Sequence, residues 1–376
     1  MLRIQQLLRQ REAIFAWFEQ HSVRSMFCVV DPVVARLPLG VEFLQLLGRR
    51  VKVMRREQVR PNPEYSAAID SAAAFLASDA DCLLGWGGGS AIDLAKLSRC
   101  EPTWIEDLTA GLPVDADMAP DPRPMLAMPT TAGSGSEATP FAVVYRQEAK
   151  FSVAHPELLP HVAIVDPAWT YNMPGSLVAA AGLDALCQSI ESMWSVRSTV
   201  ASRSEALHAL QTVWRHLGTS FESGTVESRD AMAWGAHCAG RAISVSQTTA
   251  AHALSYALTA RWGVAHGIAV ALFMPALIKW NAETPEDQVS DPRGPEHLRQ
   301  VMQQIVDALG ASSPDDAADH FTHLLRRLEA PVRLRDVGLD RRDVRWLAES
   351  VNAQRLQNNP RRIDIEQLPQ WLEQIW

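Results

Sequence analysis

The sequence predicts an α/β domain with a parallel sheet, followed by a domain built of helices alone. Short apolar runs alternate with helical patterns up to about residue 174, an order typical of βαβ units. From there to Trp376 the apolar spacing is helical and no segment has the pattern of a strand. Because 376 residues are too many for one ordinary core, we place the domains at residues 1–174 and 175–376.

The composition is that of a soluble globular protein, with 47% hydrophobic and 21% charged residues. A net charge of -8 without a Lys- or Arg-rich block argues against a nucleic-acid partner. The five cysteines are scattered and include no CxxC pair, which favours a reducing compartment. We find no signal-peptide core and no uncharged apolar run of about 18 residues, so we expect a cytoplasmic protein without a membrane span.

The elements of the first domain follow from its apolar spacing. Residues 2–18 have an amphipathic helical pattern. A hairpin with Lys150 near its turn is expected at 141–145 and 151–153. The expected strands and intervening helices are, in order, strand 25–30, helix 41–47, strand 50–54, helix 64–77, strand 81–86, helix 91–97, strand 124–128 and strand 162–165.

A glycine-rich turn follows the expected strand at 81–86. It consists of Gly87, Gly88, Gly89 and Ser90, and a helix begins directly after it. Glycines let backbone N–H groups approach a pyrophosphate, and a helix N-terminus adds partial positive charge. Ser90 is placed to cap that helix. The alternative is a plain tight turn of an α/β fold.

A second loop, at residues 129–137, follows the expected strand at 124–128. Its Thr130, Thr131 and Ser134 suit hydrogen bonds to phosphate or ribose, whereas the alternative is a flexible surface loop. Two such loops at strand ends favour a dinucleotide site, in which we also include Asp93. Asp31 ends the first of the expected strands, where a carboxylate bonds the adenosine ribose and repels a 2′-phosphate, so we expect NAD(H) rather than NADP(H).

Polar residues interrupt an apolar helix expected at 176–194. Asp184, Gln188 and Glu191 lie on one face of it. A buried acid is costly unless it is paired or bound to a cation. The alternative is an ordinary polar stripe on an amphipathic helix.

Two histidines lie fourteen residues apart in the stretch 250–274. His252 and His266 belong to two helical segments joined through Gly263. Singly, each histidine is typical of a satisfied core residue. Together with Asp184 they form a credible set for Zn²⁺ or Fe²⁺ with a position left open for substrate.

The chain resembles the iron-containing (group III) alcohol dehydrogenases over nearly its whole length. The matching pieces, in order, are VRPNPEYS, GWGGGSAIDLAK, PTTAGSGSE, VDPAWTYNMP, AGLDALCQSIES, AHALSY, GVAHGIAVALFMP and NNPR. The resemblance implies a dehydroquinate synthase-like fold, with a divalent metal in a cleft between the two domains. It places metal ligands at Asp184, Gln188, His252 and His266.

Three positions depart from the family pattern. Gln188 stands where the second ligand is usually His, and an amide oxygen is a weaker ligand for a transition metal. The site would therefore bind metal more loosely, prefer another ion, or belong to a member that works without one. Tyr256 stands where the family commonly has a substrate-facing His, and a phenol donates a hydrogen bond but is a poor base. Ser134 replaces the usual Thr.

Within the family, the segments at 190–199 and 247–267 are most similar to the phosphonoacetaldehyde reductases. A phosphonate substrate requires cations, and Arg241 lies in a small, apolar stretch upstream of His252. We expect Arg241 to be buried and, with Lys150, to hold the anionic group. The alternative is that Arg241 pairs with a structural carboxylate. Other candidate cations are Arg197, Arg203 and Arg261.

The hypothesis is NAD(P)H-dependent reduction of a small, anionic aldehyde by metal-assisted hydride transfer, with phosphonoacetaldehyde or a related phosphonate as the substrate. Tyr256 would orient the substrate or pass a proton. Three alternatives remain open: a general short-chain or polyol dehydrogenase, a dehydroquinate synthase-like lyase, and a metal-free binding protein. We expect a homodimer, because helical domains with apolar faces often pair.

Overall fold

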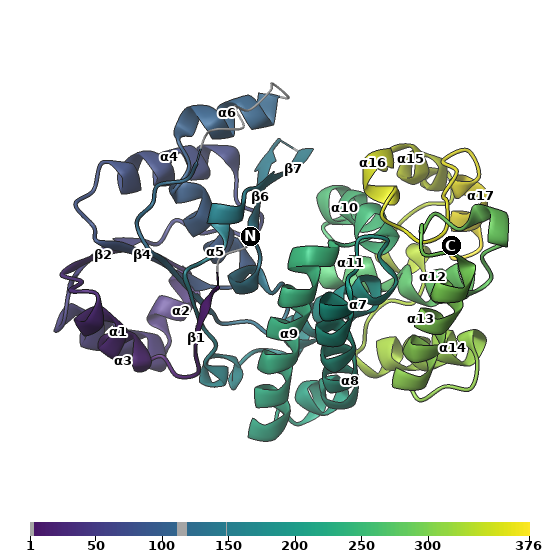
Figure 1. Cartoon of the computed structure of the whole chain (residues 1–376), viewed down its shortest axis with the longest axis horizontal. Coiled ribbons are helices and arrows are strands. Elements are labelled where there is room, and N and C mark those ends of the chain that lie inside the picture. The colour runs from purple at the N-terminus through teal and green to yellow at the C-terminus, as the bar shows by residue number, and fades with distance from the viewer. Residues whose placement is uncertain (1–3, 111–118, 148) are drawn as a thin grey trace. The chain divides into compact units, whose positions relative to one another are not determined.

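A computed structural model describes residues 4–110, 119–147 and 149–376 (Figure 1). The chain divides into two compact units, Met1–Asn172 and Met173–Trp376. The division falls two residues before the limit placed from the sequence.

The first unit is built on a six-stranded sheet of order β1-β8-β5-β4-β2-β3 in which every pair is parallel. A separate antiparallel hairpin joins β6 to β7. The strands and the hairpin expected from the sequence are confirmed, and β1 is an additional strand that the sequence did not predict. The strands are β1 Gln6–Leu8, β2 Ser25–Val30, β3 Lys52–Arg56, β4 Cys82–Gly87, β5 Met125–Pro129, β6 Phe141–Arg146, β7 Ala149–Ala154 and β8 Val162–Ile164.

Helices cover both faces of this sheet, with α1 and α3 on one face and α4 on the other (Figure 1). The helices expected at 41–47, 64–77 and 91–97 are confirmed, and each begins or ends within a few residues of its predicted limits. The helices of the first unit are α1 Ala13–Gln20, α2 Pro32–Arg36, α3 Pro38–Gly48, α4 Tyr65–Leu76, α5 Gly89–Ser98 and α6 Pro102–Ala110.

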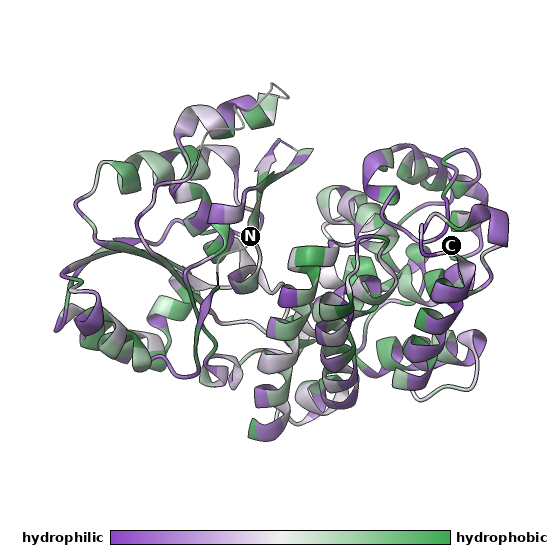
Figure 2. Cartoon of the chain, in the orientation of Figure 1, coloured by the Kyte–Doolittle hydropathy of each residue, from purple (hydrophilic) through white to green (hydrophobic). Residues whose placement is uncertain are grey.

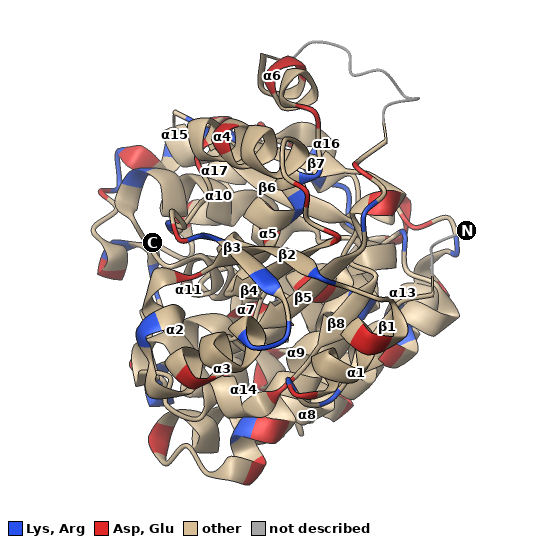
Figure 3. Ribbon diagram, turned by 90° about the vertical axis from the view of Figure 1, so that its left-hand side faces the viewer, with Lys and Arg blue, Asp and Glu red and all other residues tan. Residues whose placement is uncertain are grey.

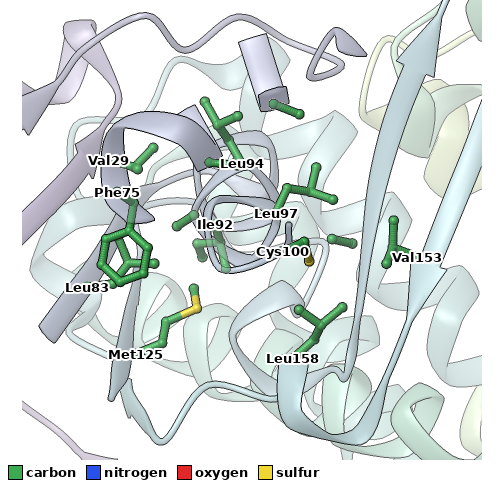
Figure 4. Packing of buried hydrophobic residues seen from close by; sticks show 14 of the residues in the cluster. Val29, Phe75, Leu83, Ile92, Leu94, Leu97, Cys100, Met125, Val153 and Leu158 are labelled. Carbon is green, nitrogen blue, oxygen red and sulfur yellow. The ribbon is translucent and has the colours of Figure 1, made fainter. Parts of the chain in front are cut away.

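Successive residues of the central strands point to opposite faces and so divide between two cores. In β2, Phe27 and Val29 pack with Phe75 of α4 and Ile92 of α5. This core is drawn in Figure 4, and hydrophobic residues follow the strands of the sheet in Figure 2. The alternate residues of β2 pack on the opposite face with α1 and α3, and they are Met26, Cys28 and Val30. Burial on both faces explains why the strands are continuous apolar runs.

The helix expected over residues 2–18 is wrong in its first half. Gln6–Leu8 forms the edge strand β1, which pairs with β8, and the helix begins only at Ala13. Tertiary contacts fix this conformation, because the Gln5 amide donates to the Pro160 carbonyl and Arg11 forms an ion pair with Asp166 at 2.7 Å. Pairing at the sheet edge thus overrides the local helical pattern.

A buried lysine ties α5 to the loop after β5. The Lys96 side chain is fully buried, and its Nζ donates to the Ser136 and Thr139 hydroxyls at 3.0 and 3.1 Å and to the Phe141 carbonyl at 2.7 Å. Burial lowers the pKa of Lys96 to about 8, against the opposing attraction of Asp93. The network fixes the small-residue loop against the helix that follows the glycine-rich turn.

The second unit, whose residues are all described, contains helices and no named strand, as predicted. No helix of the described residues is long and apolar enough to cross a membrane. Acidic and basic residues are mixed along the ribbon (Figure 3). The α-helices of the second unit are α7 Gly175–Trp194, α8 Val200–Glu222, α9 Val226–Ser246, α10 Ala250–Trp262, α11 His266–Ala271, α12 Met274–Ala282, α13 Pro295–Ala308, α14 Pro314–Arg327, α15 Asp343–Glu349, α16 Ala353–Leu356 and α17 Leu368–Glu373.

Candidate active site

The helices α7 and α11 approach each other closely at Gly267. A Cβ atom at this position would lie 1.9 Å from the Ala180 carbonyl oxygen and 2.7 Å from the Asp184 backbone nitrogen. Only a residue without a side chain allows this contact. The close approach brings His266, the first residue of α11, to Asp184 on α7.

Asp184, His252 and His266 form a cluster whose ligand atoms all lie within 4.8 Å of one another. Donor atoms bound to a divalent transition metal at about 2.1 Å are roughly 3 to 4 Å apart, so a small contraction would close the set on an ion. Asp184 and His252 are buried and His266 is half-buried. One carboxylate and two imidazoles are a donor set that suits Fe²⁺ or Zn²⁺. The cluster therefore fits a divalent metal.

Gln188 lies one helical turn after Asp184 and is buried. A hydrogen bond from its side chain helps to hold the pKa of the Asp184 carboxyl below its ordinary value. Gln188, which the resemblance gives as a metal ligand, therefore lies beside the cluster. Its proposed part in metal binding stays a prediction.

The carboxylate of Glu191 holds His252 in place and is itself fully buried. Its Oε2 contacts His252 Nδ1, which leaves Nε2 facing Asp184 Oδ1 at 3.2 Å. Its Oε1 accepts hydrogen bonds from the Thr249 N–H, the Thr249 hydroxyl and the His252 N–H at 2.9, 2.8 and 3.3 Å. Glu191 thus caps the N-terminus of α10 and orients the ring that carries the donor nitrogen.

The electrostatics of the cluster favour positive charge. Burial lowers the pKa of His252, but the carboxylates of Glu191 and Asp184 outweigh this effect and raise it to about 9. Burial acts to raise the pKa of Asp184, but the two histidines outweigh burial, so the pKa of Asp184 lies below its ordinary value. Two acids around one imidazole make this position attractive to a cation.

The turn before α10 is strained and is braced by a distant segment. Gln247 has φ 56°, a backbone conformation that is unusual for a residue other than glycine. The Asn358 amide nitrogen donates to the Ser246 and Thr248 carbonyls, both at 2.9 Å, and its oxygen accepts from the Ser195 hydroxyl at 3.0 Å. The NNPR motif was part of the family resemblance, but sequence reasoning missed this role.

Tyr256 lies beside the metal-binding cluster. Its ring stacks on that of His266, with centroids 5.9 Å apart and an interplanar angle of 14°. Burial raises the pKa of Tyr256, so the phenol stays protonated at neutral pH. Its hydroxyl accepts a hydrogen bond from Arg355 Nη1 at 3.0 Å. The sequence analysis did not predict a role for Arg355, because this residue lies 99 residues after Tyr256 in the chain.

The expectation that Arg241 is buried is wrong. Its side chain is 53% exposed and pairs with Glu205 at 2.8 Å, which is the alternative that the sequence left open. Small neighbours in the sequence indicated a core position, but Arg241 occupies an exposed position of α9. Among the other candidate cations, Arg197 donates to Gln247, Arg203 donates to Ser198 at 3.3 Å, and Arg261 faces Asp343 at 3.5 Å.

The predicted cofactor residues gather at the carboxyl ends of β2 and β4. Chain connectivity reverses here, since β3 lies on one side of β2 and β4 on the other. The Asp31 N–H donates to the Trp86 carbonyl at 2.9 Å, and the Thr130 N–H donates to the Gly87 carbonyl at 3.0 Å. Asp31 and both small-residue loops are therefore neighbours.

The two loops are also in direct contact. A Cβ atom on Gly88 would lie 3.5 Å from the Thr131 side chain, and one on Gly89 would lie 2.6 Å from the Ser134 hydroxyl oxygen. The glycines thus admit the second loop alongside the first and leave backbone N–H groups at the start of α5. This arrangement suits a pyrophosphate.

Some predicted residues have partners within the fold. Gly88, not Ser90, caps α5, and the Ser90 hydroxyl instead accepts from the Asn62 N–H at 3.3 Å. Asp93 accepts from the Ser136 hydroxyl and from the Val143 N–H, so its carboxylate fixes the second loop.

Asp31 and Lys150 were also predicted to face ligands. Asp31 Oδ1 accepts from the Val33 and Val34 N–H groups and thereby caps α2. Lys150 lies opposite Tyr145 in the hairpin, where its charge acts to lower the pKa of Asp93 against the raising effect of burial. It belongs to the first unit, whereas Arg241 belongs to the second.

A parallel sheet with a glycine-rich turn and a helical unit with a buried metal-binding cluster define the class of metal-dependent dehydrogenases. Comparison with known families agrees with this class. Residues 8–167 match the family described as iron-containing alcohol dehydrogenase, and residues 178–376 match the C-terminal part of the Fe-containing alcohol dehydrogenase family. The chain belongs to the iron-containing alcohol dehydrogenase family.

Characterised relatives cover most of the chain. It is 34% identical to the phosphonoacetaldehyde reductase of Streptomyces viridochromogenes, over 81% of this chain and 78% of that protein. It is 26% identical to the NADPH-dependent butanol dehydrogenase of Clostridium saccharobutylicum, over 89% and 86%. It is 28% identical to the 1,3-propanediol dehydrogenase of Citrobacter freundii, over 80% and 76%.

Solved structures share the fold over the full chain. The sulfoacetaldehyde reductase of Bifidobacterium kashiwanohense in complex with NAD+ matches with a TM-score of 0.85 at 24% identity. The match covers 99% of this chain and 96% of the reductase chain. The alcohol dehydrogenase of Oenococcus oeni has a TM-score of 0.85 at 25% identity, with 99% and 98% covered. The predicted fold class is confirmed.

Family membership identifies the chain as an oxidoreductase of small alcohols and aldehydes. It implies a divalent metal and a nicotinamide cofactor. The chain is thus an enzyme of the metal-dependent NAD(P) alcohol dehydrogenases, as predicted.

The contact at Gly267 leads to a prediction about metal affinity. In Gly267→Ala, the added methyl group would push α11 away from α7 and separate His266 from Asp184. We expect a loss of metal affinity of at least about 10-fold, as for other changes in the groups that orient ligands. Titration of the metal-free protein with Zn²⁺ in competition with a chromophoric chelator measures this.

Gly48→Ala is the matched control, because a Cβ atom at this helical position meets nothing within 4 Å. Circular dichroism verifies that both variants are folded. Zn²⁺ binding by Gly267→Ala as tight as that of the unchanged protein would contradict the role of the helix contact.

Proposed function

We propose that the protein reduces phosphonoacetaldehyde, or a related short aldehyde with a phosphonate group, to the corresponding alcohol. The aldehyde, NAD(P)H and one proton yield 2-hydroxyethylphosphonate and NAD(P)+, so atoms and electrons balance. The buried cluster of Asp184, His252 and His266 is the observation that carries the metal-assisted reaction. The 34% identical phosphonoacetaldehyde reductase supports the choice of substrate.

In the second unit, Asp184, His252 and His266 would hold the metal, with Gln188 as a fourth ligand. A bound divalent metal supplies a Lewis acid that polarises the carbonyl group. Glu191 keeps the His252 ring oriented and its Nε2 turned towards the cluster. Tyr256 stays protonated and stacks on His266, so it can orient the substrate and pass a proton to the developing alkoxide.

In the first unit, the backbone N–H groups at Gly87–Ser90 and the side chains of Thr130, Thr131 and Ser134 would bind the cofactor. A bound nicotinamide supplies the hydride. The close packing of the two loops leaves the start of α5 as the place for a pyrophosphate. Asp93 and Lys96 would keep the second loop in position.

A general alcohol dehydrogenase without a phosphonate preference is the second candidate. The butanol and 1,3-propanediol dehydrogenases among the relatives favour it, although at lower identity. The two candidates share the metal cluster and the cofactor residues. They differ in the ratio of kcat/KM for phosphonoacetaldehyde to kcat/KM for an uncharged aldehyde of similar size. This ratio is high for a phosphonoacetaldehyde reductase and not for a general alcohol dehydrogenase.

The proposed reaction predicts the behaviour of a ligand variant. We expect His266→Ala to lose metal and to reduce its kcat/KM for NADH-dependent aldehyde reduction by about 100-fold or more, because charge stabilisation in the transition state is lost. Metal analysis and an assay of NADH consumption, with Fe²⁺ or Zn²⁺ added, measure both effects. His323→Ala, at an exposed position of α14, is the control. Full reductase activity in His266→Ala would refute the metal role.

Asp31 generates a prediction about cofactor choice. We expect a higher kcat/KM with NADH than with NADPH, and we expect Asp31→Ser to narrow this ratio by about 10-fold, or ~1.4 kcal/mol. Serine keeps a cap for α2 while removing the negative charge that repels a 2′-phosphate. Asp79→Ser removes an exposed carboxylate elsewhere in the unit and serves as control. A preference of the unchanged enzyme for NADPH would contradict the assignment.

A further inference from the structure

We propose that Arg355 binds the anionic group of the substrate and makes this site selective for short aldehydes that carry a phosphonate or similar oxyanion. This inference rests on the proposed function and replaces Arg241 as the anion-binding residue. It assigns a role to a residue that the metal and cofactor sites do not use.

The guanidinium group of Arg355 lies close to the metal-binding cluster. Arg355 Nη1 lies 3.0 Å from the Tyr256 hydroxyl oxygen, and Arg355 Cζ lies 4.9 Å from the Tyr256 ring centroid. The same ring stacks on His266, one of the three residues of the metal-binding cluster. Within the second unit, the Tyr256 side chain therefore links Arg355 to the cluster.

The surroundings of Arg355 differ in charge from those of other arginines in the second unit. Arg241, Arg261 and Arg293 each face a carboxylate, but in the part of the chain that the structure describes no carboxylate lies within ion-pair distance of Arg355. The Arg355 guanidinium donates to the neutral Tyr256 hydroxyl. A guanidinium has five N–H donors, so one bond to a phenol leaves donors for the paired oxygens of an oxyanion. The positive charge of Arg355 is therefore available to a phosphonate.

Arg355 is held in place by the packing of its own segment. It lies in the short helix α16, which packs on α10, and the next residue, Leu356, is buried. Two residues further on, Asn358 bonds to the turn before α10, and Asn359 donates to the Asn281 side chain at 3.0 Å. The NNPR motif therefore anchors the segment that carries Arg355. A preorganised guanidinium loses less entropy on binding an anion.

The spacing between the metal-binding cluster and Arg355 limits the length of the substrate. Tyr256 contacts both His266 and Arg355, so the spacing between the metal cluster and the cation is set by one phenol ring. An aldehyde in which one or two carbons separate the carbonyl from the oxyanion matches such a short spacing. Longer uncharged aldehydes would gain nothing from the guanidinium.

The test compares Arg355→Met with the unchanged enzyme on phosphonoacetaldehyde and on butanal. Methionine keeps much of the apolar stem and removes the charge. We expect kcat/KM for phosphonoacetaldehyde to fall at least about 30-fold more than that for butanal, mainly through KM, since a charge-assisted hydrogen bond is lost. Arg355→Lys should recover part of this selective loss. Arg345→Met, an exposed arginine of α15 paired with Glu349, is the matched control.

Two results would overturn the inference. Equal losses on both aldehydes, matched by Tyr256→Phe, would show that Arg355 only positions the phenol. A phosphonate-selective loss in Arg241→Met instead of Arg355→Met would return the anion site to α9.

Failure of the proposed function is separable from failure of this inference. If the unchanged enzyme reduces no aldehyde, the proposed function falls, and calorimetry with methylphosphonate then decides the role of Arg355 by itself. Binding that Arg355→Met abolishes would support the anion site, and binding that is unchanged in Arg355→Met, or absent from the unchanged enzyme, would overturn it.

Discussion

The site depends on one buried carboxylate. Glu191 loses its hydration completely, which costs several kcal/mol for an ion, and this cost is offset only when the geometry is good and other hydrogen bonds satisfy its oxygens. Its contacts with Thr249 and His252 meet that condition. The same group caps α10, joins it to α7 and fixes the orientation of the His252 ring. Helix packing and the chemistry of the site are thus linked through a single side chain.

Two further contacts between segments of the second unit position the other residues of the cluster. Gly267 lets α11 touch α7, which brings His266 next to Asp184. The strained backbone at Gln247 is held by Asn358, so α10 begins at the position where Glu191 can cap it. In the first unit, Lys96 and Asp93 of α5 fix the loop after β5 in a comparable way. Buried polar groups thus position the loops and helices of both proposed binding sites.

Much of this organisation is predictable from the sequence, because it depends on local patterns. The strands and helices around the parallel sheet are predicted by apolar spacing. The turn at residues 87–89 is predicted by its glycines and by the strand and helix that flank it. Asp184, His252 and His266 were selected by residue type and context, and the fold brings them together. Residues 6–8 form a strand only because β8 lies next to them, and no local pattern carries this information.

The cations show where sequence reasoning fails. Small apolar neighbours suggested that Arg241 is buried, but composition along a helix does not tell which face is exposed. Arg355 has no motif of its own and reaches Tyr256 only through tertiary packing. Glu191 was grouped with Asp184 and Gln188 on one helix face, yet its role depends on where α10 begins. Pairing between distant segments therefore determines which charged residues act at the site.

The central claim is that Asp184, His252 and His266 hold a divalent metal on the framework set by Glu191. Anomalous diffraction at the absorption edge of iron or zinc tests it most directly, with crystals of catalytically active, metal-reconstituted protein. We expect one anomalous peak, at about 2.0 to 2.3 Å from the Asp184 carboxylate, His252 Nε2 and a ring nitrogen of His266. An active crystal without a peak at these residues would contradict it.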